Sequence, residues 1–268
     1  GLRLNSPLGD AHLTDLSVSD DPASLGQVDA VLVAVKTWQI PDVASQMAPL
    51  LKDDTVVVPF LNGVEAAQQI ADVIGAGKVL GGLSKIFSFI EAPGVIKHFS
   101  PQAIIAFGEM NAPPTDRCKA LKAAFDAAGV EAYVETDIQS ELWKKLLMVG
   151  SWSGLSALNR SPLGELRDFE PTRALIDAAM GEGIAVARTM GVGGIDEGYK
   201  DTLWQFYADL PDGATSSMAR DIWDGKPSEL DAWNGAIHRF GVECGVPTPV
   251  HSFTYHALLP MERRARSG

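Results

Sequence analysis

The sequence has little of what marks secreted, membrane-embedded or nucleic-acid-binding proteins. It has only two cysteines, Cys118 and Cys244, which excludes a disulfide framework and makes a reducing cytoplasm the expected location. No apolar run reaches the roughly 18–20 residues of a membrane span, and no signal-peptide pattern is visible. The 22 basic residues are outnumbered by 34 acidic ones, which gives a net charge of −12. This charge argues against a nucleic acid or an anionic membrane as partner, because both need clustered lysine and arginine.

Sequence patterns for two kinds of ligand are also missing. The five histidines lack the HxxH and HExxH spacings of metal sites, so we expect no metal. A glycine-rich phosphate loop lies between a strand and a helix, and neither glycine-rich segment has that context. Residues 191–194 follow a predicted helix, and residues 75–77 precede a predicted strand. An anionic small molecule is still a suitable ligand, because it needs only one or two local cations.

Short buried strands alternate with helices in the first half of the chain. With 46% apolar residues, the chain can form a substantial core. The runs Val28–Val35 and Thr55–Phe60 are typical of strands that are buried on both faces. A helical segment follows each run, and this alternation predicts an α/β fold with a doubly wound parallel sheet over residues 1–137. Residues 138–268 are expected to contain helices only, which predicts a second, all-α domain.

More detailed expectations concern strand pairing and the ends of elements. Residues 2–19 are expected to form a short hairpin, and strand 103–108 is expected to pair with strand 94–99. The basic tail 261–268 is expected to be frayed. In the second half, helices are expected over residues 138–158, 171–190, 196–208, 214–223, 228–244 and 250–260.

The helix predicted over residues 138–158 has a lysine inside its apolar face. At about 100° per residue, Lys145 lies on the same face as Val149, one turn later, and Ser153, two turns later. A lysine in this position has to extend its ammonium group to solvent, find a partner or line a polar cleft. Two interpretations remain open: Lys145 reaches solvent at a domain boundary, or Lys145, Val149 and Ser153 face a ligand.

Polar residues follow the two buried strands of the first half. Lys36 comes directly after the run that ends at Val35, and Asn62 comes two residues after Phe60. Ligands on a doubly wound sheet bind at the carboxyl ends of its strands, so these positions suit a cation and an amide that line one crevice. The alternative is a solvent-facing lysine and an ordinary Asn-Gly turn.

In the second half, two candidate residues lie at the starts of predicted helices. Ser217 lies in the run Thr215–Met218, whose hydroxyl and N–H groups can cap a helix, hold a substrate carboxylate, or do both. Glu229 lies in the first turn of the helix predicted over residues 228–244. A carboxylate is favourable there through the helix dipole alone, so a structural role for Glu229 is the alternative to a functional one.

Seven short segments, taken in their order along the chain, resemble those of a known family. They are Val35–Gln39, Pro59–Gly63, Pro93–His98, Trp143–Leu146, Ser216–Met218 with Asp221, Glu229–Gly235 and Gly245–Pro249. With these features in register, the chain resembles the 2-dehydropantoate 2-reductase (ketopantoate reductase) family over essentially all of its 268 residues. Each segment is weakly specific alone, and the specificity comes from finding all seven in the correct order.

The resemblance implies an NADPH-dependent reductase that converts a 2-keto acid to a 2-hydroxy acid, as in the pantoate step towards coenzyme A. It implies a Rossmann-like NADP-binding domain followed by a helical substrate domain, and a homodimer is possible by fold analogy. In this family pattern, Lys145 matches the proton donor to the ketone oxygen, and Glu229 matches the acidic residue at the nicotinamide and substrate end of the cleft. Lys36 and Asn62 match residues that touch the cofactor, and Asn62 also touches the substrate. Ser217 matches a substrate-binding serine.

Two departures from the family pattern affect these expectations. The family opens with a strand, a glycine-rich loop and a helix that are not in this sequence, so roughly 40 residues are expected to be missing before Gly1. We therefore expect this chain alone to bind NADPH poorly.

The second departure lies on the lysine-bearing helix. Better-studied family members carry substrate-binding asparagines at the positions of Val149 and Ser153, so the substrate pocket here is expected to be less polar. A related 2-keto acid or another carbonyl compound then becomes an alternative substrate. Two other classes also remain open, namely another two-domain hydroxyacid-type dehydrogenase and a non-catalytic protein that retains the fold.

Overall fold

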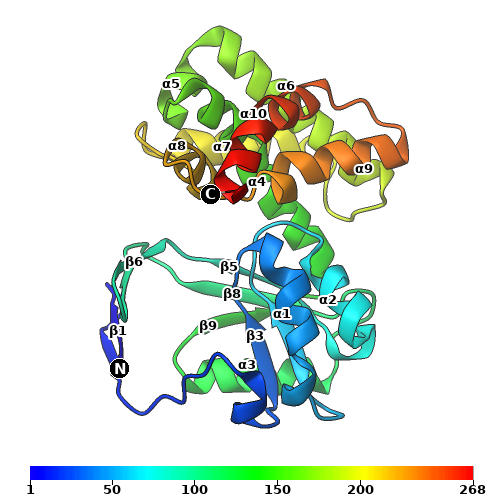
Figure 1. The fold of residues 1–268 in the computed structure, drawn as a ribbon. Coiled ribbons are helices and arrows are strands. Elements are labelled where there is room, and N and C mark those ends of the chain that lie inside the picture. Colours follow the sequence, from blue (N-terminus) through cyan, green and yellow to red (C-terminus); the bar gives the residue numbers. More distant parts are fainter. Residues whose placement is uncertain (268) are drawn as a thin grey trace. The chain divides into compact units, whose positions relative to one another are not determined.

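The computed structural model describes residues 1–267, which form two compact units. The first unit consists of Gly1–Leu61 and Ala66–Ile138 and contains every described strand. The second unit contains the segment Asn62–Glu65 and the helical chain from Gln139 onward. Figure 1 shows the strands and helices of each unit. The predicted fold class, an α/β part followed by an all-α part, is confirmed, although the sheet part is mixed and not fully parallel.

The Val-rich runs form a parallel strand pair that is covered by two helices. Strand β3 (Ala30–Val33) pairs with β4 (Val56–Pro59), and Ala30 lies opposite Val56. All four residues of β4 are buried, as expected for a strand that is covered on both faces. The same expectation is wrong for β3, in which only Val33 is buried and Leu32 is exposed. Helices α1 (Ile40–Gln46) and α2 (Ala66–Ile74) contribute Ile40 and Ile70 to the adjoining core.

A second group of strands in this unit has the order β5-β8-β9. Strands β5 (Gly81–Lys85) and β8 (Ile104–Gly108) are antiparallel, whereas β8 and β9 (Glu131–Val134) are parallel. Helix α3 (Asp116–Ala127) packs on this group through Cys118 and Leu121. A single parallel bridge between Val57 and Val79 connects β4 to the residues just before β5.

The remaining strands form a four-stranded sheet with the order β2-β1-β7-β6. Its members are β1 (Leu2–Asn5), β2 (Ala11–Leu13), β6 (Ser88–Ala92) and β7 (Val95–His98). The predicted hairpin in residues 2–19 is confirmed, because β1 and β2 are antiparallel neighbours. The predicted pairing of residues 94–99 with 103–108 is wrong. The tight turn at Gly94 (φ +75°) places β7 beside β6, and β8 pairs with β5 instead.

The second unit is a bundle of helices around one large core. The core includes the buried side chains of Trp143, Leu147, Met180, Tyr207 and Trp233. The elements are α4 (Ile138–Asn159), α5 (Leu163–Asp168), α6 (Glu170–Thr189), α7 (Tyr199–Asp209), α8 (Ser217–Trp223), the π-helical turn η5 (Asp231–Gly235), α9 (Ala236–Cys244) and α10 (Pro249–Ser267). The short helix α5 and the π-helical turn are not among the predicted elements.

Helix α10 corrects the expectation of a frayed tail. The helix continues to Ser267, although Pro260 lies inside it. One turn before its end, the buried Glu262 accepts a hydrogen bond of 2.7 Å from Arg266 Nε. This i,i+4 ion pair and the burial of Glu262 hold the last turns in place. Gly268 lies outside the described residues, and within residues 1–267 no helix is long and apolar enough to cross a membrane.

Candidate functional site

The folding of the helical unit brings together two predicted site residues that are 167 positions apart. Asn62 Nδ2 donates a hydrogen bond of 2.8 Å to Glu229 Oε2. Glu229 is only 4% exposed and Asn62 is half-buried, so this contact is largely shielded from solvent. The amide and the carboxylate therefore form one polar site, called here the Asn62–Glu229 pair.

The backbone on both sides of this pair has unusual local structure. Gly63 has φ of +86°, and a Cβ at this position would lie 3.2 Å from Ala232 O. Glycine is required because it tolerates both the positive φ and the close approach. Directly after Glu229 the chain forms the π-helical turn η5, in which Gly235 N donates to Leu230 O over 3.0 Å. Such turns are rare and frequently lie at functional sites.

The predicted stripe of Lys145, Val149 and Ser153 lies along one face of helix α4, as the helical spacing requires. Lys145 and Val149 are half-buried, whereas Ser153 is fully buried. The Ser153 hydroxyl donates to Val149 O, one turn earlier in the same helix. The neighbouring Lys144 pairs with Glu141 at 2.8 Å and so has a separate structural role.

The two serines at the start of helix α8 have different roles. Ser216 is the N-cap, and its Oγ accepts a hydrogen bond of 3.0 Å from Ala219 N. Ser217 is the first residue of the helix and is half-buried. Because Ser216 provides the cap, the Ser217 hydroxyl is not needed for capping, and substrate binding by Ser217 stays a prediction.

Lys36 belongs to the sheet unit. It follows β3 and starts the short 3-10 helix η2 (Thr37–Gln39), where its backbone N–H donates to Gln39 Oε1 over 3.0 Å. Its ammonium group lies 5.8 Å from the centre of the Trp38 ring, which is within the range of a cation–π contact. Cofactor binding by Lys36 stays a prediction.

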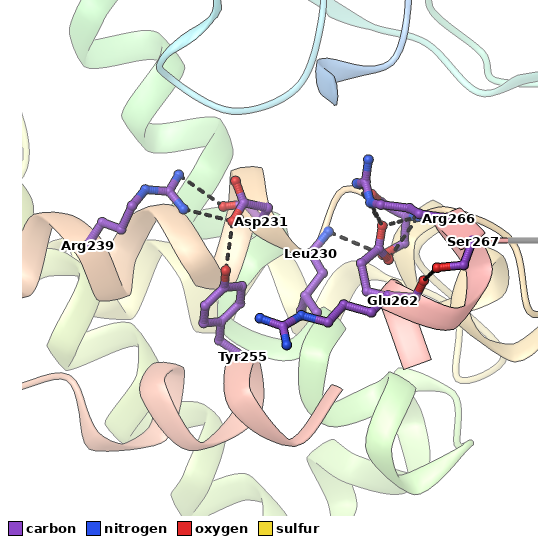
Figure 2. Close-up of polar contacts among 9 residues, drawn as sticks. Leu230, Asp231, Arg239, Tyr255, Glu262, Arg266 and Ser267 are labelled. Carbon is purple, nitrogen blue, oxygen red and sulfur yellow. Dashed lines mark hydrogen bonds and ion pairs between the residues drawn. The ribbon is translucent and has the colours of Figure 1, made fainter. Parts of the chain in front are cut away.

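Several charged residues near the Asn62–Glu229 pair were missed in the sequence. Arg239 on α9 contacts both Glu65 and Asp231, and Tyr255 on α10 donates to Asp231, as Figure 2 shows in part. The only sequence signal is that Glu65 and Asp231 lie close to Asn62 and Glu229. Burial lowers the pKa of Arg239, but the carboxylates of Glu65 and Asp231 outweigh this effect and raise it above its usual value. The guanidinium therefore stays charged at any physiological pH.

Comparison with known families identifies the chain along most of its length. Residues 1–112 match the family model described as ketopantoate reductase PanE/ApbA. Residues 137–262 match the model for the C-terminal part of the same family. The two matches cover both structural units, and together they include every predicted site residue.

Individual proteins of known sequence are also similar to this chain over most of their length. A 2-dehydropantoate 2-reductase of Mesorhizobium japonicum is 30% identical over an alignment of 287 positions. This alignment covers 98% of this chain and 84% of that protein. An uncharacterized oxidoreductase of Bacillus subtilis is 29% identical over 258 residues, which cover 96% of this chain and 84% of that protein.

Solved structures match the fold of this chain. A ketopantoate reductase from Ralstonia eutropha JMP134 superimposes with a TM-score of 0.89 at 28% identity, over 99% of this chain and 86% of that one. A ternary structure of D-mandelate dehydrogenase with NADH and anilino(oxo)acetate has a TM-score of 0.86 over 99% of this chain and 86% of that one, and at 21% identity it shows the shared fold alone. The family models and the sequence relatives agree, and the chain belongs to the ketopantoate reductase family of oxidoreductases.

Proposed function

We propose that this protein uses NADPH to reduce a small 2-keto acid of the 2-dehydropantoate type to the corresponding 2-hydroxy acid. The observation that carries the proposal is the Asn62–Glu229 pair, in which two residues with assigned roles in the family pattern meet at 2.8 Å. Membership of the ketopantoate reductase family and the names of the sequence relatives support the reaction class.

The polar atoms at the pair suit a pyridine nucleotide. Asn62 uses Nδ2 to bind Glu229, and its Oδ1 is of the type that accepts from a carboxamide or hydroxyl group. Glu229 uses Oε2, and its Oε1 can accept from a ribose hydroxyl. Lys36 in the sheet unit offers a cation for a phosphate. When bound, NADPH supplies the hydride, and an NADH complex of a protein with this fold supports a nicotinamide cofactor.

Lys145 is proposed as the general acid. Hydride addition to a ketone turns its oxygen into an alkoxide, and an ammonium group beside that oxygen stabilises the negative charge and donates the proton. The half-buried position of Lys145 on α4 strengthens such an interaction, because charges interact more strongly when they are partly shielded from water. Glu229 is proposed to keep the ammonium charged and oriented, and to hold the cofactor.

Three further residues are proposed to shape the substrate site. Asn62 and the hydroxyl of Ser217 offer hydrogen bonds to the substrate. Val149 presents an apolar surface on the same face of α4 as Lys145, and Ser153 directs its hydroxyl to the helix backbone. This less polar pocket favours 2-keto acids whose side chains are more apolar than that of ketopantoate.

The test is turnover of a panel of 2-keto acids with small, branched and aromatic side chains by the full-length protein, followed as NADPH oxidation. Lys145→Ala is expected to lower kcat/KM by at least about 100-fold, the usual contribution of a positioned general acid. Lys144→Ala is the matched control, because it removes the adjacent lysine of the same helix, which pairs with Glu141. Unchanged turnover in Lys145→Ala would overturn the proposal.

A further inference from the structure

Arg239 bridges two carboxylates that come from distant parts of the chain. From α9, its Nη2 donates to Glu65 Oε2 over 2.7 Å, and its Nη1 donates to Asp231 Oδ1 over 2.9 Å. A third bond of 3.3 Å runs from Nη2 to Asp231 O. Figure 2 shows the guanidinium facing Asp231. The planar fork of an arginine holds two acceptors in a fixed relative geometry, which a lysine ammonium cannot do.

Each of the two carboxylates lies next to one member of the Asn62–Glu229 pair. Glu65 is three residues after Asn62, in the four-residue segment Asn62–Glu65 that belongs to the helical unit. Asp231 is two residues after Glu229 and begins the π-helical turn. The segments that carry Asn62 and Glu229 are therefore linked twice. One link is the direct Asn62–Glu229 hydrogen bond, and the other runs through Arg239.

The position of Asp231 is itself fixed from another element. Tyr255 on α10 donates from its hydroxyl to Asp231 Oδ1 over 2.8 Å, the same oxygen that accepts from Arg239. Asp231 is thus held by two donors from two helices, although its side chain is 56% exposed. The ion pair with Glu65 is the more buried side of the bridge, because the Glu65 side chain is only 26% exposed.

We propose that Arg239 is a positioning residue. It binds Glu65 and Asp231 at the same time and thereby keeps Asn62 within hydrogen-bonding distance of Glu229. Arg239 acts through these residues and does not itself touch the substrate or the cofactor. The catalytic consequence of this inference rests on the proposed reductase function, whereas the effect on the Asn62–Glu229 contact does not.

The kinetic test is a double-mutant cycle. Arg239→Met is expected to lower kcat/KM by about tenfold, because a misplacement of about 1 Å is enough to reduce a reaction rate strongly. In an Asn62→Ala background the same substitution is expected to change kcat/KM less than about twofold, because residues that act as a unit are non-additive. Arg239→Lys is expected to restore only part of the loss, since a lysine ammonium lacks the planar fork that fixes the two carboxylates relative to each other.

Two further variants keep this test interpretable. Glu65→Met removes the acceptor at the more buried end of the bridge and is expected to reproduce the Arg239→Met effect, even if Arg239→Met folds poorly. Arg188→Met is the control, because it removes another arginine–glutamate ion pair of the same unit, a more exposed one with Glu197, and it is expected to leave kcat/KM unchanged.

A readout without turnover is the side-chain amide signal of Asn62 in a protein labelled with 15N-asparagine. This signal is expected to move in Arg239→Met and Glu65→Met towards its position in Glu229→Met, which lacks the acceptor of the Asn62 amide, and to stay in place in Arg188→Met. An unmoved signal in both bridge variants, or fully additive kinetic effects, would overturn the inference. Full activity of Lys145→Ala together with a moved signal would overturn the proposed function alone.

Discussion

At the scale of single residues, Gly63 sets how closely the Asn62 segment approaches the π-helical turn. Replacing Gly63 with alanine adds a Cβ at φ of +86° and at 3.2 Å from Ala232 O. A positive φ alone costs an alanine roughly 1–2 kcal/mol. Gly63→Ala is therefore expected to lower the free energy of unfolding, measured in urea, by more than this amount, because the backbone contact adds to the strain.

The matched control for this prediction is Gly245→Ala. Gly245 has a similar φ of +74°, but no atom lies within 4 Å of the position that a Cβ would take, so only the backbone strain applies. An equal loss of stability in the two variants would contradict the role given to the Ala232 contact.

His251 gives a second prediction at this scale, which concerns pH. Burial lowers the pKa of His251 to about 4, and its ring lies between Asn234 Nδ2 at 3.0 Å and Ala179 O at 3.0 Å. The unfolded chain takes up this proton near pH 6.5, while the folded protein resists it until about pH 4. Stability from this group is therefore complete above pH 6.5 and is lost as the pH falls towards 4, by about 3 kcal/mol in total.

The measurement is urea unfolding at several pH values between 7 and 4 for the natural protein and for His251→Gln. The pH dependence is expected to be shallower in His251→Gln. Parallel pH curves for the natural protein and His251→Gln would contradict the assignment.

At the scale of elements, the end of α10 fixes the start of the segment that carries Glu229. The carboxylate of the buried Glu262 accepts from Ser228 N at 3.1 and 3.0 Å and from the Ser228 hydroxyl, and it pairs with Arg266. Glu262→Gln is expected to cost about 2 kcal/mol of stability, because hydrogen bonds to a buried charged group are among the stronger ones. Glu243→Gln, on an exposed position of α9, is the control in urea unfolding and is expected to be neutral.

The sequence predicts the elements better than their pairing. The Val-rich runs identify both β3 and β4, and in β4 the continuous apolar run matches a strand that is covered on both faces. Sequence periodicity does not say which strands become neighbours, and the pairing expected for residues 94–99 was wrong for this reason. The π-helical turn has only five residues and α5 only six, which is too short for either to show a periodicity that distinguishes it from its surroundings.

The candidate site shows the same division. Position in the chain and the family resemblance single out Asn62 and Glu229, which the structure brings into contact. They also single out Lys145, whose catalytic role stays a prediction. Their surroundings depend on tertiary contacts: Arg239 and Glu65 are 174 positions apart, and no local pattern connects them. The N-cap role of Ser216 is the intermediate case, since a serine before a helix predicts capping but does not say which of two serines provides it.

At the scale of the whole molecule, the homodimer expected from the family resemblance stays a prediction. Sedimentation equilibrium at the concentration used for kinetics is expected to give twice the chain mass of 28.6 kDa. A single species at the mass of one chain would contradict this prediction.

The segment Asn62–Glu65 also bears on how such a gene can be inherited. The chain passes into the helical unit after Leu61, returns after Glu65 and passes over again after Ile138, so no single junction separates the two units. A recombination event near residue 138 would transfer a helical half without its own Asn62 amide and Glu65 carboxylate. The donor of the first half would then supply the partners of Glu229 and Arg239. Asn62, Glu65, Glu229 and Arg239 are thus expected to be inherited as one set, although they lie on both sides of a boundary between two units.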